Sequence, residues 1–343
     1  MPDTFNPVGS AGQTPSVPRS VFITGANGFI GKALFARYQA LGCEVKGMDI
    51  QADAERNVIG GDLCQPAEWA FHAEGCELFL HTAAVVSLAA DWSLYREVSI
   101  NGTRKALDVA IEAGASRFVH FSSIAAMGVD YLQGADEKCP VVVGEDYRYG
   151  VTKGASEHVV LAAHAAGEIN CTIIRPADVY GPGSRAWIIE PLKMAKSGQY
   201  LLPDKGTGRF TPVYIDDLVD GVMLAAGLAQ GSGQIFILAG EHCVSCREFF
   251  AYHWRWAGKT GNIPSLPLNG ALLATRALAR LNRLLKKPSE VTPDAMLMFS
   301  RQGGYSIDKA RELLGYQPKV SLEQGMQHSE AWLQEIGELT RTP

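Results

Sequence analysis

Three residues, Ser123, Tyr149 and Lys153, have side chains and spacing that suit proton transfer at a C–O group. Tyr149 and Lys153 are four residues apart, so they share one face if their segment is helical. A nearby ammonium and a positively charged ring bound beside the phenol would both lower the pKa of the tyrosine toward neutrality. Ser123 can donate a hydrogen bond to a substrate oxygen. The three groups could therefore bind an alcohol or a ketone while a hydride moves to or from its carbon.

The same Tyr-x-x-x-Lys spacing occurs a second time, at Tyr305 and Lys309. Tyr149 opens a predicted helix within a region of alternating strands and helices. Tyr305 instead lies in the C-terminal region, where Ser306 is expected to be the N-cap of a short helix. We therefore predict a structural role for Tyr305.

The elements that must position these groups begin with a glycine-rich turn. Residues 21–31 read VFITGANGFIG, an apolar run that leads into Gly25, Gly28 and Gly31. A strand, tight turn and helix of this kind brings backbone N–H groups to a pyrophosphate at the helix N-terminus. The next predicted strand ends in Asp49, where a carboxylate accepts hydrogen bonds from ribose hydroxyls and repels a 2′-phosphate. Together these features predict NAD, rather than NADP, as the cofactor.

Strands and helices then alternate along the chain. Strands are predicted at 44–49, 58–63, 78–84, 117–123 and 171–175, with helices at 92–113 and 149–166. This alternation is typical of an α/β protein with a doubly wound parallel sheet. Ligands bind at the carboxyl ends of the strands in such sheets. The residues expected to meet there are Gly25, Asp49, Asp62, Ala83 and Ser123.

Domain organisation follows from where this alternation loosens. We expect a disordered leader at 1–19, an NAD-binding Rossmann core at 20–180 and a smaller C-terminal substrate-binding lobe at 181–336, with 212–240 returning to the core. Within the predicted helix 92–113, the pair Asn101-Gly102 carries a propensity cost, which suggests close packing or a local function.

The ordered set of motifs resembles the extended short-chain dehydrogenase/reductases, also called the NAD-dependent epimerase/dehydratase family. The resemblance runs from about Ser20 to about Trp332. It implies a Ser123–Tyr149–Lys153 catalytic triad, bound NAD(P), and a homodimer packed through helices 92–113 and 149–166. The implied cofactor-binding residues are Gly25, Asn27, Gly28, Phe29, Ile30, Gly31, Asp49, Asp62, Leu63, Ala83, Ala84, Asn101, Tyr149, Lys153 and Pro176. The implied substrate residues are Val85, Ser123, Met127, Tyr149 and Asp178.

Several positions depart from the sugar-nucleotide enzymes of that family. Ile124 and Ala125 replace the acidic pair of the dehydratases, and Thr211 stands where an arginine is favoured. Asp178 replaces an asparagine that often holds the substrate diphosphate, and its charge would repel phosphate. The predicted wall is apolar, and its residues are Val85, Val86, Leu88, Met127 and Trp187. These features look more like the 3β-hydroxysteroid dehydrogenase-like branch.

We therefore predict an NAD-dependent oxidoreductase that interconverts a secondary alcohol and a ketone on a hydrophobic or small substrate. The alternative is a sugar-nucleotide 4-epimerase with tightly bound NAD. A non-catalytic NAD-binding regulator would be expected to have a damaged triad, and all three triad residues are present.

Composition limits the other function classes. The chain has 343 residues and a net charge of −5, which argues against nucleic acid as a partner. The N-terminal residues lack the apolar core of a signal peptide, and no apolar run approaches the ~20 residues of a membrane span, so a cytoplasmic protein is expected. Cys243 and Cys246 lack a second ligand pair for zinc. Ser245 and Glu248 are expected to form a capping box beside them, and no metal site is predicted.

A basic amphipathic segment at 271–287 has a clear helical period. Its basic stripe is Arg276, Arg280, Arg283 and Lys287, and its apolar stripe is Leu273, Ala277, Leu281 and Leu284. A helix packed on the lobe, a lid over an apolar pocket, and a helix in peripheral contact with a membrane surface all have this pattern.

Overall fold

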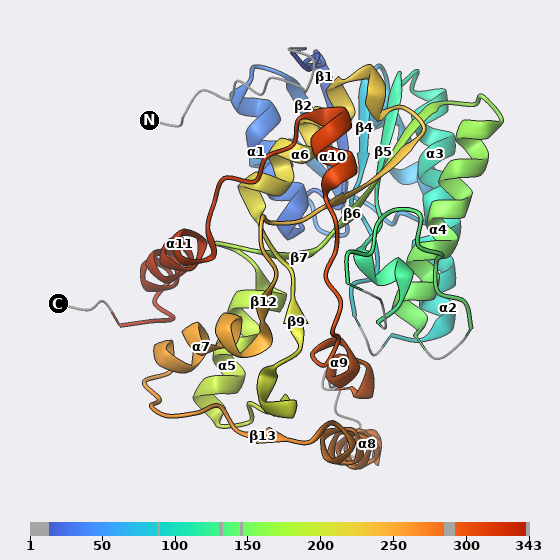
Figure 1. The fold of residues 1–343 in the computed structure, drawn as a ribbon. Coiled ribbons are helices and arrows are strands. Elements are labelled where there is room, and N and C mark those ends of the chain that lie inside the picture. The colour runs from blue at the N-terminus through green and yellow to red at the C-terminus, as the bar shows by residue number, and fades with distance from the viewer. Residues whose placement is uncertain (1–13, 88–89, 130–132, 145–146, 285–291, 341–343) are drawn as a thin grey trace.

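A seven-stranded parallel sheet forms the centre of the computed structural model, which describes residues 14–87, 90–129, 133–144, 147–284 and 292–340 (Figure 1). The strand order is β11-β6-β5-β4-β1-β2-β3, and every neighbouring pair is parallel. The order reverses at β1 and β4, as in doubly wound folds. The strands are β1 Ser20–Thr24, β2 Glu44–Asp49, β3 Val58–Gly60, β4 Leu78–His81, β5 Arg117–Phe121, β6 Asn170–Pro176 and β11 Gln234–Leu238. The predicted α/β fold is confirmed.

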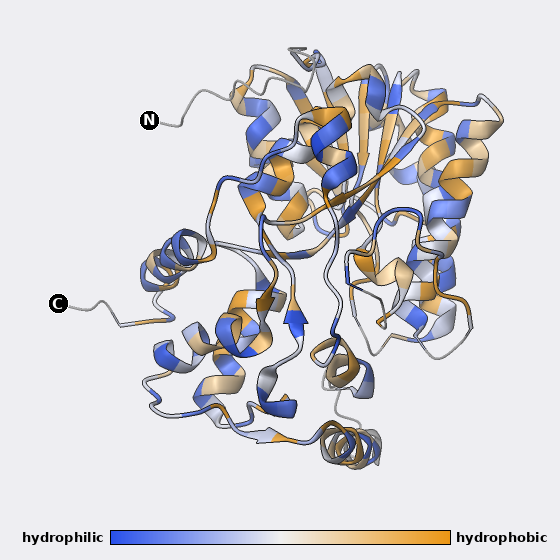
Figure 2. Ribbon diagram, in the orientation of Figure 1, coloured by the Kyte–Doolittle hydropathy of each residue, from blue (hydrophilic) through white to orange (hydrophobic). Residues whose placement is uncertain are grey.

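Helices cover both faces of this sheet. One face packs against α1 Phe29–Ala40 and α6 Ile215–Gly227, and the other packs against α3 Gly102–Glu112 and α4 Arg148–Ala165. Side chains alternate along each strand, so Ile23 and Leu80 join the first layer, whereas Phe22 and Phe79 join the second. Hydrophobic residues accordingly concentrate in the strands of the sheet (Figure 2).

The remaining elements form a smaller lobe, which occupies the lower part of Figure 1. Its helices are α5 Glu190–Ser197, α7 Cys246–Trp256, α8 Leu268–Leu284, α9 Pro293–Met298 and α11 Leu322–Glu335. Three two-stranded sheets pair β7 Asp178–Tyr180 with β10 Pro212–Tyr214, β9 Arg209–Phe210 with β12 Val244–Ser245, and β8 Leu202–Pro203 with β13 Ser265–Leu266. One further helix, α10 Asp308–Leu314, lies between α9 and α11 in the chain and packs on the large sheet beside α6.

The predicted helix 92–113 differs from the structure in its first half. It consists of the short α2 Trp92–Leu94, a π-helical stretch Tyr95–Asn101, and α3. A π-helical turn widens a helix and is frequent at functional sites. The expected close packing at the Asn-Gly pair is confirmed, because a Cβ at Gly102 would lie 2.8 Å from Cδ2 of Leu63.

Two helix starts test the capping predictions. Ser245 and Glu248 form the predicted capping box at the start of α7. The prediction for Ser306 was wrong, since α10 begins at Asp308 with Ile307 as its N-cap. The Ser306 hydroxyl instead accepts a hydrogen bond from the Asp308 N–H at 3.0 Å.

Some predicted features lie outside the described residues, namely leader residues 1–13, Leu88, and positions 285–287 of the basic segment. Residues 14–19 have no helix or strand, and the Ser16 N–H donates to the Gly227 carbonyl oxygen at 3.0 Å. None of the described helices combines the length and the apolar character that crossing a membrane requires.

Candidate active site

Ser123 and Tyr149 lie together where α4 packs on the turn after β5. Ser123 is the N-cap of a short 3-10 helix, Ile124–Met127, and its hydroxyl accepts a hydrogen bond from the Ala125 N–H at 3.1 Å. A Cβ at Gly150 would lie only 2.4 Å from the Ala125 carbonyl oxygen. Glycine therefore lets the start of α4 approach this turn closely. The Ser123 and Tyr149 side chains are hydrogen-bonded to each other.

Lys153 lies one turn further along α4, buried beneath the tyrosine. Its ammonium donates to the Phe121 carbonyl oxygen at 2.8 Å, and its Nζ lies 6.0 Å from the centroid of the Tyr149 ring. Burial lowers the pKa of Lys153 to about 8, an effect opposed by the negative charge of Glu157. The lysine is therefore mostly charged at neutral pH and loses its charge in mildly alkaline solution. The structure thus brings the three predicted triad residues together.

The protein alone raises the pKa of Tyr149, whereas the downward shift expected from the sequence included a positive nicotinamide ring beside the phenol. Burial raises this pKa, and the hydrogen bond from Ser123 opposes the shift. The side chain is therefore a neutral phenol at pH 7, ready to donate a proton.

A buried ion pair, which the sequence pattern did not predict, lies directly behind the triad. Glu157 accepts hydrogen bonds from Nε and Nη2 of Arg175, at 2.8 and 2.7 Å. The same carboxylate accepts a hydrogen bond from the Ser122 hydroxyl at 2.5 Å. Glu157 is one helical turn beyond Lys153, and Ser122 directly precedes Ser123. The ion pair therefore links α4, β6 and the end of β5 just behind the triad.

Two buried histidines on β4 and β5 extend this polar layer. His81 bonds Thr24 Oγ1 at 2.8 Å and Thr103 Oγ1 at 3.1 Å, and its ring stacks on His120 with centroids 5.5 Å apart. His120 bonds the Ser156 hydroxyl on α4 at 2.9 Å. Burial, reinforced by the charge of Lys153, lowers the pKa of His81 to about 3. Both rings are therefore neutral at physiological pH, since burial also lowers the pKa of His120.

The glycine turn has the shape that a dinucleotide requires. Gly25 has φ +71°, and a Cβ there would lie 2.8 Å from the Ala83 backbone nitrogen. A Cβ at Gly31 would lie 2.2 Å from the Gly25 carbonyl oxygen. The N-cap of α1 is Gly28, with no side-chain cap and no acidic residue in the first turn. The N-terminal donors of α1 therefore remain available for an anion, which fits the pyrophosphate of NAD.

Asp49 lies beside this turn, as predicted for a ribose ligand. Its Oδ2 accepts a hydrogen bond from the Asn27 N–H at 2.8 Å, and its Oδ1 accepts one from the Ile50 N–H at 2.7 Å. These bonds fix the carboxylate at the carboxyl end of β2. Arg56, which the sequence did not single out, bonds Asn27 Oδ1 and forms an ion pair with Asp53. The rim of this region is thus held in place by charged side chains.

The other predicted cofactor residues have different surroundings. Asp62 is exposed and accepts a hydrogen bond from the Cys64 N–H at 2.9 Å, and Asn101 is exposed and donates to Glu97 at 3.1 Å. Leu63 and Pro176 are buried, the first against Gly102. Four more are partly exposed, namely Phe29, Ile30, Ala83 and Ala84.

Among the predicted substrate residues, Val85 is partly exposed and Met127 is buried beside Ser123. Asp178 is also buried, and its carboxylate forms an ion pair with Arg301 and accepts a hydrogen bond from the Thr211 N–H at 3.0 Å. Burial raises the pKa of Asp178, whereas the Arg301 charge lowers it. Asp178 therefore acts inside the protein, and its charge is balanced there.

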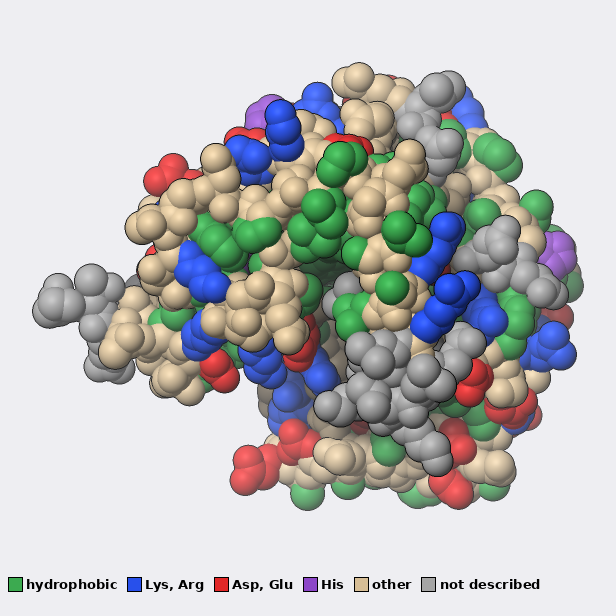
Figure 3. Space-filling model, turned by 90° about the horizontal axis from the view of Figure 1, so that it is seen from below, with side chains coloured by type: hydrophobic (Ala, Val, Ile, Leu, Met, Phe, Trp, Pro, Cys, Tyr) green, Lys and Arg blue, Asp and Glu red, His purple; other side chains and the backbone are tan. Residues whose placement is uncertain are grey.

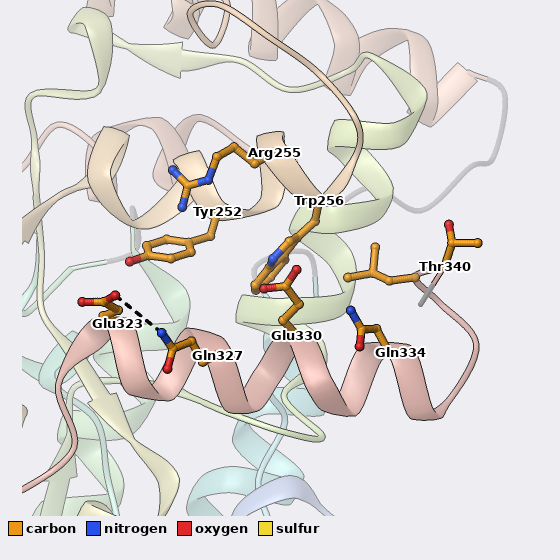
Figure 4. A pocket seen from close by; sticks show the side chains of 9 residues that line it. Tyr252, Arg255, Trp256, Glu323, Gln327, Glu330, Gln334 and Thr340 are labelled. Carbon is orange, nitrogen blue, oxygen red and sulfur yellow. Dashed lines mark hydrogen bonds between the residues drawn. The ribbon is translucent and has the colours of Figure 1, made fainter. Parts of the chain in front are cut away.

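A cavity of about 430 Å³ lies elsewhere, between α7 and α11 (Figure 4). Tyr252, Arg255 and Trp256 line it from α7, and Glu323 and Glu330 line it from α11. No predicted site residue borders this cavity. Among the described residues, no group of three histidine, cysteine or acidic side chains could hold a metal ion.

Comparison with known proteins agrees with this geometry. The family model described as "NAD dependent epimerase/dehydratase family" matches residues 21–239. A 4-hydroxy-2-methyl-3-oxo-4-farnesyl-3,4-dihydroquinoline-1-oxide ketoreductase of Stigmatella aurantiaca is 26% identical over an alignment of 317 residues, which covers 89% of this chain and 94% of the relative. A 3 beta-hydroxysteroid dehydrogenase/Delta 5→4-isomerase of Mycobacterium tuberculosis is 26% identical over 345 residues, covering 93% and 91% of the two chains.

The fold also resembles solved structures. The UDP-glucuronic acid 4-epimerase of Bacillus cereus, solved in complex with NAD, superposes with a TM-score of 0.74 at 21% identity. The likeness covers 93% of this chain and 99% of that chain.

Proposed function

The chain belongs to the NAD-dependent epimerase/dehydratase family, and from that premise we propose that it interconverts a secondary alcohol and a ketone on an apolar substrate. The protein is an oxidoreductase acting on CH–OH groups. NAD, when bound, supplies hydride acceptance or donation.

The observation that carries the proposal is a pair of strongly exposed valines on segments that adjoin the carboxyl ends of β4 and β5. Val86 is 73% exposed and follows β4, and Val143 is 84% exposed in a segment that bonds to the turn after β5. That segment is held by the Val142 N–H, which donates to the Ala126 carbonyl oxygen at 2.7 Å. Exposed apolar side chains near the ligand-binding edge of a parallel sheet favour an apolar ligand. In addition, Arg301 forms an ion pair with Asp178, so the positive charge of the guanidinium is balanced within the protein.

Each triad residue has a defined task in this reaction. The Ser123 hydroxyl donates a hydrogen bond to the substrate oxygen. In reduction, the Tyr149 phenol gives its proton to that oxygen; in oxidation, the phenolate accepts the proton of the alcohol. The buried Lys153 side chain is positively charged below about pH 8, and in that state its ammonium stabilises the phenolate.

A turnover screen tests the proposal. The purified chain is mixed with NAD and secondary alcohols, including hydroxysteroids and sugar nucleotides, and NADH absorbance is followed. We expect NADH release with apolar alcohols. Tyr149→Phe should lower turnover by about 10²-fold or more with NAD binding nearly unchanged, because proton transfer is lost. Tyr305→Phe, at the second Tyr-x-x-x-Lys, is the matched control and should retain turnover.

The alternative, a sugar-nucleotide 4-epimerase, predicts a different outcome. Such an enzyme recycles NADH internally, so sugar nucleotides would be epimerised while no NADH appears in solution with any alcohol. That result would overturn the dehydrogenase proposal. We also propose a homodimer through the helices from Trp92 to Glu112 and α4, for which analytical ultracentrifugation should give twice the 37.0 kDa of one chain.

A further inference from the structure

Helix α8 is attached to the protein by a narrow inner face. Ala271 and Thr275, one turn apart, are buried, and the Thr275 hydroxyl donates to the Ala271 carbonyl oxygen at 2.9 Å. Ala271 packs with Ala295 and Met296 of α9 in a small cluster of its own. At the start of the helix, the Leu268 N–H donates to the Asp204 carboxylate at 2.8 Å. These contacts fix which face of α8 points outward.

The outward face carries the apolar stripe that the sequence predicted. Leu273 is 70% exposed, and Ala277, one turn later, is also exposed. A helix packed through its leucine stripe, or a lid closed by it, would bury these residues. The structure instead buries the alanine and threonine of the opposite face. The apolar stripe of α8 therefore points away from the protein over the part of the helix whose side chains are described.

Positive charge borders that stripe. Arg276 and Arg280 are exposed and lie one turn apart, beside Leu273 and Ala277 on the helix surface. Within the described part of the chain, neither guanidinium forms an ion pair with a carboxylate. α8 contains three arginines and no acidic residue, although the whole chain has a net charge of −5. The positive charge is thus concentrated locally on an otherwise acidic protein.

The location of α8 leaves it accessible. Together with α9, it lies at the lower end of the molecule, away from the large sheet (Figure 1). The face seen from below shows Lys and Arg side chains among hydrophobic ones, with a hollow near its centre (Figure 3). A flat, negatively charged surface could reach this end of the molecule without obstruction from the sheet domain.

We propose that α8 binds the surface of an anionic lipid bilayer. Leu273 and Ala277 enter the headgroup region, and Arg276 and Arg280 bind lipid phosphates. Guanidinium groups bind phosphate oxygens in a bidentate manner, and apolar residues between basic ones are typical of helices that lie in a membrane interface. Charge complementarity favours this occupant, because an anionic bilayer presents phosphates over its whole surface. A second copy of the chain would bind α8 only through a surface on which its carboxylates match the two arginines.

Vesicle flotation of the full chain tests this proposal. Wild-type protein should float with vesicles that contain phosphatidylglycerol, should not float with phosphatidylcholine alone, and should be released by high salt. Arg276→Gln/Arg280→Gln should weaken binding roughly thirtyfold, since each arginine contributes about fivefold at an anionic surface. Leu273→Glu should abolish flotation. Because these side chains are exposed, the melting temperature should not change.

A charge-matched control separates a specific surface from a general charge effect. Arg19→Gln/Lys46→Gln removes two cations just before β1 and on β2, away from α8, and should bind vesicles like the wild type. Equal weakening in this variant, or no flotation of the wild type at low salt, would overturn the proposal. A dimer that dissociates on Leu273→Glu, without flotation, would show that the stripe joins two copies instead.

Discussion

The buried ion pair behind the triad gives a sharp test of the structure through Glu157→Gln. Glu157 and Arg175 are 3% and 2% exposed. The variant keeps the shape of the side chain but leaves the guanidinium charge buried and uncompensated, and Nη1 of that arginine has no hydrogen-bond partner in the described structure. Removing one member of such a pair costs about 3–5 kcal/mol of unfolding free energy. The Ser122 hydroxyl also loses its charged acceptor.

The loss should be measurable by thermal and urea unfolding. With an unfolding entropy of about 2.1 cal/mol/K per residue, a cost of about 4 kcal/mol in a chain of 343 residues lowers Tm by about 6 °C. The exposed pair of Arg104 and Glu168 is the matched control, with both side chains 37% exposed. Glu168→Gln should cost less than about 1 kcal/mol. The double variant Glu157→Gln/Arg175→Met should be more stable than the sum of its single changes predicts.

Glu157→Gln has a second effect, on the pH dependence of turnover. The Glu157 charge raises the pKa of Lys153, so its removal should lower that pKa further below about 8. Lys153 would then lose its proton at a lower pH, and the alkaline limb of kcat/KM for ketone reduction should move to lower pH. A stability loss no larger than that of Glu168→Gln would refute the energetic reasoning. A stability loss with an unmoved alkaline limb would refute the link to Lys153.

Three further changes follow from the structure. Gly31→Ala places a Cβ 2.2 Å from a backbone carbonyl oxygen, so it should cost about 1–3 kcal/mol and weaken NAD binding in calorimetry, whereas Gly270→Ala, with 3.7 Å to its nearest neighbour, should do neither. Asp49→Asn should shift kcat/KM toward NADP, because the carboxylate no longer repels a 2′-phosphate; an unchanged ratio would count against its role. His81 and His253, each with a pKa of about 3, take up protons only on unfolding below pH 6.5, so urea unfolding should show stability falling with decreasing pH by about 1.4 kcal/mol per unit for each.

Local patterns were sufficient to predict the sheet, the glycine turn and the placement of Ser123, Tyr149 and Lys153 near one another. The apolar runs that end in Gly25, Asp49 and Ser123 each form a parallel strand, and parallel strands end at one edge. The spacing of Tyr149 and Lys153 fixed their common face because helical geometry is local. These predictions needed no knowledge of distant contacts.

The buried ion pairs could not be predicted in this way, because their partners are far apart in the chain. Asp178 and Arg301 are separated by 123 positions, and only the assembled lobe brings them together. The π-helical stretch from 95 to 101 also depends on packing, since its sequence has an ordinary helical period. The upward shift of the Tyr149 pKa in the protein alone also depends on packing, because desolvation follows burial, which the sequence does not specify.

Two neighbouring hydroxyls just after β5 show how a local sequence pattern and tertiary packing combine. Side chains alternate along extended backbone, so Ser122 and Ser123, which directly follow β5, point to opposite sides. Ser122 is buried and bonds Glu157, whereas Ser123 is partly exposed and bonds Tyr149. One backbone segment therefore carries a reacting hydroxyl on one side and its anchor on the other. The charge behind the anchor can then influence the triad without contacting the substrate, and this is why Glu157, rather than a residue lining the cleft, offers the most informative perturbation of the site.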